Sequence, residues 1–477
     1  MSKKLMALAS LAAITVAAKA QDTLRANVLD PIVVTATKTE QKQSTTGKVI
    51  TVIGKDVIER STGKTVAQLL NEQAGITING AYNNLGSVQS VFMRGSNVGR
   101  TLILVDGIPQ NDPSFINNEY DLNFFNLNDI ERIEVCRGAQ STLYGSDAVA
   151  GVINIITINK NTTKPFNVKA TVTGGSRDTY KGNLQVYGKA KKFIYQARYA
   201  TTNTKGFSAA YDSAGNKNFD RDGYKGHIAS ASVMYAATSN FNVRTFAQYS
   251  RYKAAIDASG FNDDKDYNIT NKVFTTGAGF TYKASALTLT GNYQYSELSR
   301  NYLNDNGFIS GFSSFERNEY AAKTQFAELY ASINLGSGFT LLQGGDYRRG
   351  NMSNDYLSVS SFGPYASKFK DTALSQASLY SSLQYNYKKF YVELGGRINV
   401  HSRYGNNETY TFNPAYNFND HYRVFASAAT GFKAPSLYQL YAGGGTGNAD
   451  LKPEESKNYE VGVQQQHNKI ANRLVFF

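Results

Sequence analysis

The sequence contains few of the residues and motifs that stabilise small secreted domains or build common enzyme sites. It has one cysteine, Cys136, no tryptophan and 8 prolines in 477 residues. A single cysteine cannot form an internal disulfide, which excludes a disulfide scaffold. After an apolar run at residues 5–18, no stretch of 18 or more apolar residues follows, which excludes a helical membrane span on length. The 4 histidines form no HExxH motif, and neither a G-x-S-x-G elbow nor a phosphate-binding loop is present, so we predict no enzyme.

The first 20 residues have the pattern of a cleaved export signal. Lys3 and Lys4 precede the apolar run, and residues 18–20 (AKA) fit an A-x-A cleavage site. No cysteine follows that site, so lipid attachment there is not indicated. We predict a signal peptide at residues 1–20 and an exported protein; the alternative is a first buried helix.

Tyrosine, phenylalanine and glycine are abundant, with 33, 27 and 41 residues. From about residue 165 onward, polar and apolar residues alternate, as in "LTLTGNYQYS" at 287–296. Membrane-spanning strands of about 9 to 11 residues alternate in this way and carry aromatic residues near their ends. We therefore predict a transmembrane antiparallel β-barrel over residues 163–477, with a soluble β-sandwich as the alternative.

The formal net charge is +13, and the charges are scattered along the chain. For an exported chain, this balance favours anionic outer-leaflet lipid, such as lipopolysaccharide, or an anionic ligand. We do not expect nucleic-acid binding.

Residues 41–162 have a mixed pattern that predicts an α+β domain. Residues 66–75 (VAQLLNEQAG) read as a short amphipathic helix that ends at a glycine, and residues 101–109 read as an apolar strand followed by an Asp-Gly turn. Residues 132–157 place two apolar strands around a glycine-rich turn. Residues 21–40 are polar, and we expect a mobile tail there.

Five segments of this sequence resemble TonB-dependent outer-membrane receptors, most closely the cobalamin receptor branch. They are residues 90–95 (SVFMRG), 102–109 (LILVDGIP), 130–157 (IERIEVCRGAQSTLYGSDAVAGVINIIT), 429–441 (ATGFKAPSLYQLY) and 448–463 (NADLKPEESKNYEVGV). Small departures are Ala74 and Ala139, where the family often has proline, and Cys136, where it usually has a larger apolar residue.

The resemblance implies a plug domain inside the barrel lumen and active import of a scarce bulky nutrient. The expected ligand is cobalamin, with a ferric siderophore or haem as the alternative. The expected partners are a TonB-type energy-transducing protein, outer-membrane lipid and the barrel assembly machinery, with no covalent cofactor. A passive channel or a surface adhesin is the alternative of another class.

The resemblance also identifies a TonB box in "DPIVVTA". A short β-prone segment can add as a strand to the edge of a partner's sheet; the alternative is an ordinary first strand of the plug. The box residues are Asp30, Pro31, Ile32, Val33, Val34, Thr35 and Ala36.

Charged residues suggest two further sites. By resemblance, Arg94 and Arg137 of the plug would meet barrel carboxylates, with Glu328 and Glu460 as candidates, or else pair within the plug. Loop carboxylates resemble the calcium-binding loops of the cobalamin receptor branch, and the alternative is a solvated acidic loop. The candidate calcium ligands are Asp212, Asp220, Asp222 and Asp257, and "FNDDKD" at 261–266 offers further carboxylates.

The length of the barrel region conflicts with a complete family barrel. About 22 strands of roughly 20 residues each, with their connections, need about 440 residues. The region after residue 163 has roughly 310. We therefore expect an incomplete barrel from a truncated, non-functional receptor; the alternative is a smaller closed barrel of roughly 14 to 16 strands.

Overall fold

The computed structural model describes residues 32–157, 162–215, 219–305, 313–419, 421–442, 447–467 and 470–477. The expected signal peptide at 1–20, together with Asp30 and Pro31 of the expected TonB box, lies outside the described residues. Within the described residues, no helix combines the length and the apolar character needed to cross a membrane.

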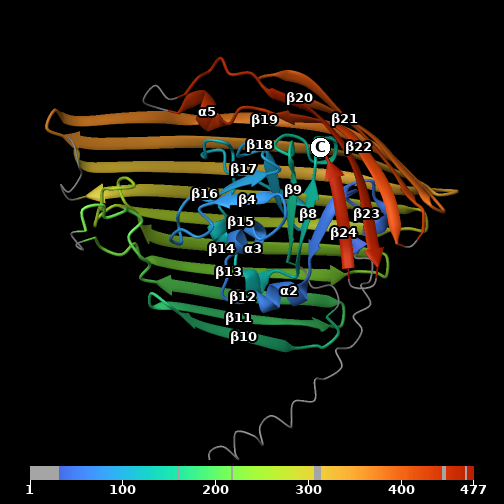
Figure 1. Ribbon diagram of the computed structural model, residues 1–477, viewed down its shortest axis with the longest axis horizontal. Coiled ribbons are helices and arrows are strands. Elements are labelled where there is room, and N and C mark those ends of the chain that lie inside the picture. The colour runs from blue at the N-terminus through green and yellow to red at the C-terminus, as the bar shows by residue number, and fades with distance from the viewer. Residues whose placement is uncertain are drawn as a thin grey trace, which may run out of the picture.

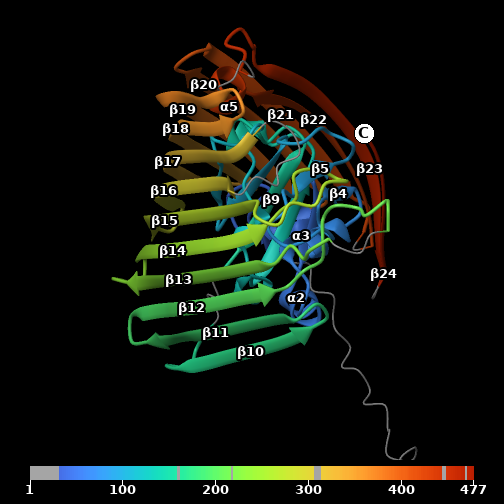
Figure 2. The same ribbon diagram turned by 90° about the vertical axis from the view of Figure 1, so that its left-hand side faces the viewer.

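One antiparallel sheet of 15 strands forms the larger part of the molecule (Figure 1). Each strand pairs with the next in chain order, and the sheet curves around the N-terminal domain (Figure 2). Among the described residues, β10 and β24 form the two ends of the sheet, and each pairs with one strand only. The strands are β10 (Asn167–Gly175), β11 (Thr179–Ala190), β12 (Phe193–Thr204), β13 (Tyr224–Ala236), β14 (Phe241–Ala255), β15 (Asn268–Lys283), β16 (Leu287–Asp305), β17 (Ser313–Gly336), β18 (Phe339–Ser360), β19 (Gly363–Tyr387), β20 (Phe390–His401), β21 (Gly405–Asn417), β22 (Tyr422–Lys433), β23 (Glu454–His467) and β24 (Ile470–Phe476).

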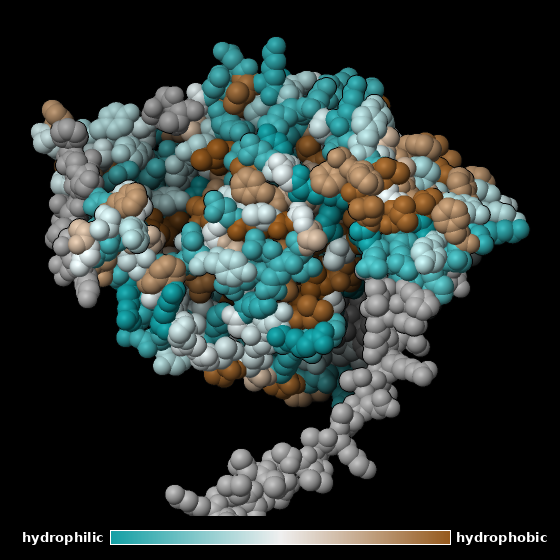
Figure 3. Space-filling view, in the orientation of Figure 1, coloured by the Kyte–Doolittle hydropathy of each residue, from teal (hydrophilic) through white to brown (hydrophobic). Residues whose placement is uncertain are grey.

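Alternating side chains give this sheet an apolar outer face and a polar inner face. In β16, Tyr293 is 47% exposed, whereas its neighbour Gln294 is 4% exposed against the domain. Val461 and Val463 in β23 also point outward, and Figure 3 shows hydrophobic residues gathered over the last strands at the right of the view. This is the arrangement that a membrane-spanning sheet requires. The predicted period of two is confirmed.

The connections between neighbouring strands differ at the two ends of the strands. At one end, which we call the turn side, neighbouring strands are joined by short segments such as 191–192 and 337–338. At the other end, the loop side, longer segments such as 205–223, 256–267 and 434–453 join them. The last of these carries the short helix α5 (Leu437–Tyr441).

The N-terminal domain, which we call the plug, is built around a five-stranded mixed sheet in the order β3-β8-β9-β6-β7. Strands β6 and β9 run parallel, and the other neighbours run antiparallel. Two further pairs are β1 with β2 and β4 with β5. The elements are β1 (Ile32–Val33), β2 (Gln41–Lys42), η1 (Gln43–Thr45), β3 (Val49–Ile53), α2 (Lys55–Arg60), α3 (Val66–Asn71), β4 (Ile76–Asn79), β5 (Ser90–Met93), β6 (Thr101–Val105), β7 (Ile108–Gln110), η2 (Leu122–Phe124), η3 (Leu127–Asp129), β8 (Arg132–Arg137), α4 (Ser141–Tyr144) and β9 (Gly151–Ile156).

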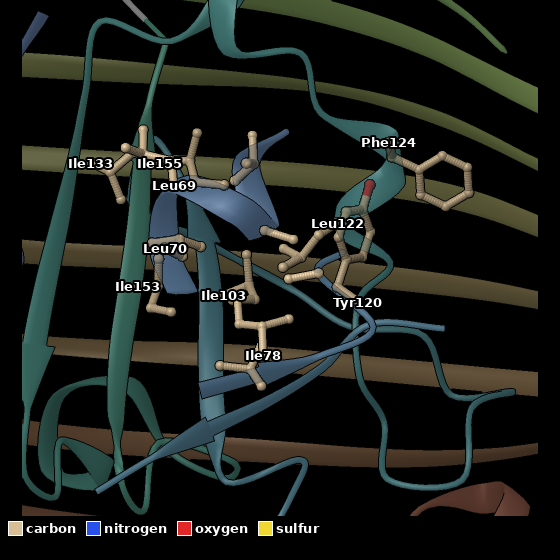
Figure 4. Packing of buried hydrophobic residues seen from close by; sticks show 14 of the residues in the cluster. Leu69, Leu70, Ile78, Ile103, Tyr120, Leu122, Phe124, Ile133, Ile153 and Ile155 are labelled. Carbon is tan, nitrogen blue, oxygen red and sulfur yellow. The ribbon is translucent and has the colours of Figure 1, made fainter. Parts of the chain in front are cut away.

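The apolar core of the plug lies between α3 and this sheet (Figure 4). Leu69 and Leu70 on α3 pack with Ile153 and Ile155, which flank Asn154 in β9. Thr65 caps the helix by accepting a hydrogen bond from the Gln68 amide at 3.1 Å, and the Gln68 side chain accepts one from the Thr65 amide at 3.0 Å. The helix predicted at 66–75 is confirmed, although it ends at Asn71.

The glycine-rich stretch at 132–157 folds as predicted into two strands, β8 and β9, around a compact turn that contains α4. Gly145 ends α4 with φ +73°, a conformation that a side chain with a Cβ rarely adopts. An added Cβ at Gly145 would lie 2.8 Å from the Arg397 guanidinium in β20. The glycine therefore lets the plug backbone approach the sheet closely.

Candidate functional site

The N-terminal segment 32–38 is docked into the plug. The Glu134 carboxylate in β8 accepts hydrogen bonds from the Val34 amide at 2.9 Å, the Thr35 amide at 2.9 Å and the Thr35 hydroxyl at 2.7 Å. Val33 and Ala36 are fully buried, whereas Ile32 is exposed. The prediction of a mobile tail is therefore wrong for residues 32–38, because the buried Glu134 carboxylate accepts hydrogen bonds from the backbone amides of this segment.

Lys38 ties this segment to the sheet through a buried ion pair with Glu328 in β17. Tyr380 donates a second hydrogen bond to Glu328 at 3.0 Å. The rings of Tyr144, Tyr330 and Tyr380 lie within 4.7 to 5.6 Å of the Lys38 ammonium and add cation–π contacts. Burial lowers the pKa of Lys38, and the Glu328 carboxylate opposes that shift. The charged pair is thus fully enclosed between plug and sheet.

Lys48, ten residues after Lys38, forms a second buried ion pair between the plug and the sheet. Its ammonium donates to the Ala36 carbonyl at 2.6 Å and lies 3.1 Å from Glu393 in β20. Ser382 and Asn413 donate to the same carboxylate at 3.1 and 2.9 Å. Glu393 is therefore satisfied on several sides, as a buried charge must be.

The four residues predicted to pair plug and barrel are only partly brought together. Arg94 lies 2.5 Å from Glu460 in β23, across the boundary between plug and sheet. Arg137 instead donates within the plug, to the Thr51 hydroxyl and the Ala74 carbonyl, both at 2.7 Å. Burial and the nearby Arg94 lower the pKa of Arg137 to about 10. Glu328 pairs with Lys38 instead of with either arginine.

The loop-side carboxylates form a cluster at the connections after β12 and β14. Single oxygens of Asp220, Asp257 and Asp263 lie within 4.8 Å of one another. Asp222 is buried beside them and accepts from the Ala209 amide at 2.6 Å. Asp212, which the sequence placed in this set, is not a member of the group of three.

Two carboxylates of this cluster have raised pKa values, because they are buried and lie close to other carboxylates. Burial raises the pKa of Asp220 to about 6, and the Asp263 carboxylate adds to the shift. Burial also raises the pKa of Asp222 to about 7, and Asp257 adds to it. Within the described part of the chain, one carboxylate oxygen of Asp222 is buried without a hydrogen-bond partner. The set has the oxygen donors that a hard cation prefers.

A small cavity separates the loop-side end of the plug from the sheet. We call it the loop-side cavity; it holds about 120 Å³ and lies between Pro109 and Pro113 of the plug and Arg348, Arg349 and His401 of the sheet. A space of that size holds only a few waters. Its sheet side is cationic, which suits an anionic group on a ligand.

Sequence reasoning missed several residues of these sites. Lys38, Lys48 and Glu393 stand in no motif, and Glu134 lies in the segment 130–157 without a predicted role, because their partners are up to 345 residues away in the chain. Asp263 belongs to "FNDDKD", which offered carboxylates without showing which of them would meet the others.

A plug domain on the inner side of a large, curved and outwardly apolar antiparallel sheet is typical of plugged outer-membrane receptors. A family model described as TonB-dependent Receptor Plug Domain matches residues 42–152, and one described as TonB dependent receptor-like, beta-barrel matches residues 214–476. The chain belongs to the TonB-dependent receptor family.

Among curated proteins, the chain is similar to vitamin B12 transporters named BtuB. It is 28% identical to that of Photobacterium profundum over 450 residues, covering 92% of this chain and 68% of the relative. It is 27% identical to that of Vibrio vulnificus over 452 residues, covering 91% of this chain and 67% of the relative. The chain thus spans about two thirds of the length of these relatives.

Solved structures confirm the fold. The siderophore receptor PirA of Acinetobacter baumannii superposes with a TM-score of 0.71 at 20% identity, over 89% of this chain and 69% of that one. A mutant of the ferric enterobactin receptor PfeA of Pseudomonas aeruginosa gives 0.72 at 18% identity, over 93% and 72%.

Proposed function

We propose that this chain imports cobalamin across a Gram-negative outer membrane, driven by a TonB-type protein that binds the segment 30–36. The observation that carries the proposal is the similarity to vitamin B12 transporters along 92% of the chain. The docked, strand-forming segment at Ile32–Val33 supports it, because a partner can take such a segment up as an added strand. The barrel assembly machinery would insert the chain among lipid and lipopolysaccharide.

A plugged lumen also argues against a passive channel or a simple adhesin. The two cavities that share Gln294, at the boundary between plug and sheet, hold about 120 and 70 Å³. Spaces of that size hold only a few waters, so these two cavities pass no nutrient unless the plug moves.

Cyanocobalamin is therefore expected to bind the purified mature chain refolded in detergent, with saturation at one equivalent. The measurement is a titration followed by tryptic protection or calorimetry. A ferric catecholate complex and haem serve as competitors, since Arg348 and Arg349 at the loop-side cavity also suit an anionic chelate. Saturable binding of either competitor without cobalamin binding would reject cobalamin and retain the receptor.

We further propose that the loop-side carboxylates bind calcium. Asp220, Asp257 and Asp263 supply oxygens at close range, and Asp222 adds a buried oxygen without a partner in the described chain. Four clustered carboxylates repel one another unless a cation or protons neutralise them. The raised pKa values of Asp220 and Asp222 are the proton-bound alternative to a bound cation.

Calcium affinity is expected to fall as the pH drops through the raised pKa values, because protons and calcium compete for the same oxygens. The Asp220 pKa of about 6 predicts at least a tenfold weaker affinity at about pH 5 than at about pH 8. Asp220→Asn should weaken binding at about pH 8 by tenfold or more. Calorimetric titration with calcium chloride measures both effects.

The matched control is Asp178→Asn, which changes a loop-side acid that pairs with Lys205 outside the cluster. Its calcium affinity should equal that of the unchanged chain. Equal affinities for Asp220→Asn and the unchanged chain would show a solvated acidic loop instead.

A further inference from the structure

Four cations gather on the outer face of the sheet, near its loop side. They are Lys225 of β13, Arg251 and Lys253 of β14, and Lys272 of β15, and all four are exposed. Tyr252, between two of them, is buried in the apolar cluster of the plug. Because successive side chains of a strand point to opposite faces, the four cations point away from the plug. We call these four residues the cationic patch.

The register of the strands brings the four cations close together. Lys225 lies directly opposite Lys253, and Arg251 lies directly opposite Lys272. The Cβ atoms of such pairs are about 4.5 to 5.5 Å apart, and like charges at this spacing repel each other. The patch therefore places four positive charges in an area about 10 Å wide and about 7 Å high.

The described part of the chain supplies no anion to the cationic patch. None of the four side chains forms an ion pair or a hydrogen bond with a described residue. Further round the same outer face, by contrast, Lys323 of β17 lies 3.4 Å from the Glu297 carboxylate of β16. Tyr295 donates a hydrogen bond to that carboxylate at 2.5 Å. The protein thus neutralises the neighbouring cation but leaves the patch to an anion from outside.

The cationic patch borders the apolar band of the outer face. Toward the turn side, the next outward residues include Tyr199, Tyr249 and Phe274, whose aromatic side chains are exposed. From Tyr249 to Phe241, β14 extends for about 26 Å, so even a tilted strand covers most of an apolar band about 25 Å tall. The other outward residues of β12–β15 along this length are all uncharged: Ala197, Tyr195, Phe193, Ala229, Ala231, Val233, Tyr235, Ala247, Thr245, Val243, Thr276, Ala278, Phe280 and Tyr282.

The position of the cationic patch along the strands corresponds to the headgroups of the outer leaflet. Outer-membrane barrels have their longer loops on the extracellular side and their short turns on the periplasmic side. Arg251 lies two residues, or about 7 Å, beyond the aromatic Tyr249 on the loop side. Lysine and arginine side chains at such an interface lay their apolar stems along the hydrocarbon and extend the charge to the headgroups.

We propose that the cationic patch binds the phosphate groups of an outer-leaflet lipid, whose acyl chains lie against the apolar band of β12–β15. Four positive charges match a lipid with two phosphate monoesters, each of which carries about −1.5 to −2 charges at pH 7. Lipid A, the membrane anchor of lipopolysaccharide, has this chemistry. A free phosphate has the same charge but no chains to contact the apolar band. The site is independent of the solute that the chain imports.

The first test measures lipid binding to the full-length mature chain, refolded in detergent, by native mass spectrometry. The probes are diphosphoryl lipid A and monophosphoryl lipid A with the same acyl chains. Each cation near an anionic headgroup adds to the attraction, so the diphosphoryl lipid should bind about tenfold or more tightly than the monophosphoryl lipid. Replacing all four patch cations with glutamine should weaken its binding by about tenfold or more and remove the preference.

The matched control removes the same charge from exposed turn-side lysines, by replacing Lys189, Lys191, Lys283 and Lys388 with glutamine. It should keep both the affinity and the preference for two phosphates. An equal loss in the control would show that net charge alone attracts the lipid, and equal affinities of the unchanged chain for the two lipids would overturn the match to two phosphates. An excess of inorganic phosphate should not displace lipid A; displacement would overturn a lipid as the ligand.

The second test leaves the four cations in place, so it holds even if the fourfold variant does not fold. The chain contains no tryptophan, so a single introduced tryptophan reports on one position. Tyr249→Trp places it beside the cationic patch, and Phe241→Trp places it at the other end of β14, about 26 Å away. Energy transfer to a dansyl group on the headgroup of lipid A, added in equimolar amount in detergent, should be several times stronger from position 249. Equal transfer from the two positions would overturn the site.

Discussion

Replacing Glu328 with alanine is expected to release the N-terminal segment from the plug. Lys38 is fully enclosed, and Glu328 is its ion-pair partner. Removing one partner of a buried pair costs about 3 to 5 kcal/mol, because the remaining charge must leave or stay unpaired. Such a loss raises the undocked fraction of the segment by about 100-fold or more.

The measurement is the mobility of a spin label at Ile32→Cys in a Cys136→Ser background. Ile32 is 57% exposed, so the label itself does not disturb the docking. Glu319→Ala is the control, since Glu319 lies on the same strand and pairs with Arg317 in a partly exposed position. Its spectrum should match that of the unchanged chain. An immobile label in Glu328→Ala would mean that Glu134 alone holds the segment.

Proline at position 33 is expected to abolish uptake while leaving ligand binding intact. Proline lacks the amide hydrogen that an added strand donates to its partner, and it is confined to places where no ladder bond is needed. The segment 32–38 does not line the loop-side cavity, where we propose that the ligand binds, so equilibrium binding should be unchanged. Cyanocobalamin uptake by cells and binding to the purified chain give the two readouts.

Val33→Ala is the matched control, because it removes the buried side chain and keeps the amide. It should retain most of the uptake. If Val33→Ala loses uptake to the same extent, the side chain's packing matters and strand addition does not explain the role of Val33.

The strands were predictable because alternation is a local property of the sequence. Successive side chains of a strand point to opposite faces, so the alternation of residue types predicts that Tyr293 points outward and Gln294 points inward. The helix α3 was equally readable from Thr65, Gln68 and the apolar spacing. In these elements the residues that form the pattern are also the ones whose local interactions determine the structure.

The buried ties were not predictable, because they depend on which strand faces which part of the plug. Lys38 and Lys48 read as polar loop residues, and nothing local distinguishes Glu393 from a solvated carboxylate. The resemblance singled out Glu328 but with an arginine as its partner, whereas the structure pairs it with Lys38. Asp263 joins Asp220 only because two separate connections meet on the loop side. Residue types suggested such contacts, but only the three-dimensional arrangement selects the partners.

The order of the buried ties along the chain determines how the docked segment responds to tension. Glu134 holds residues 34 and 35, Lys38 holds the next point, and Lys48 holds the last. A partner that pulls on the chain ahead of Ile32 therefore loads these attachments one after another. Because the attachments break in sequence, the peak force equals that of the strongest single attachment and not the sum over all of them. A slow, steady pull can thus detach a segment that thermal motion alone leaves in place.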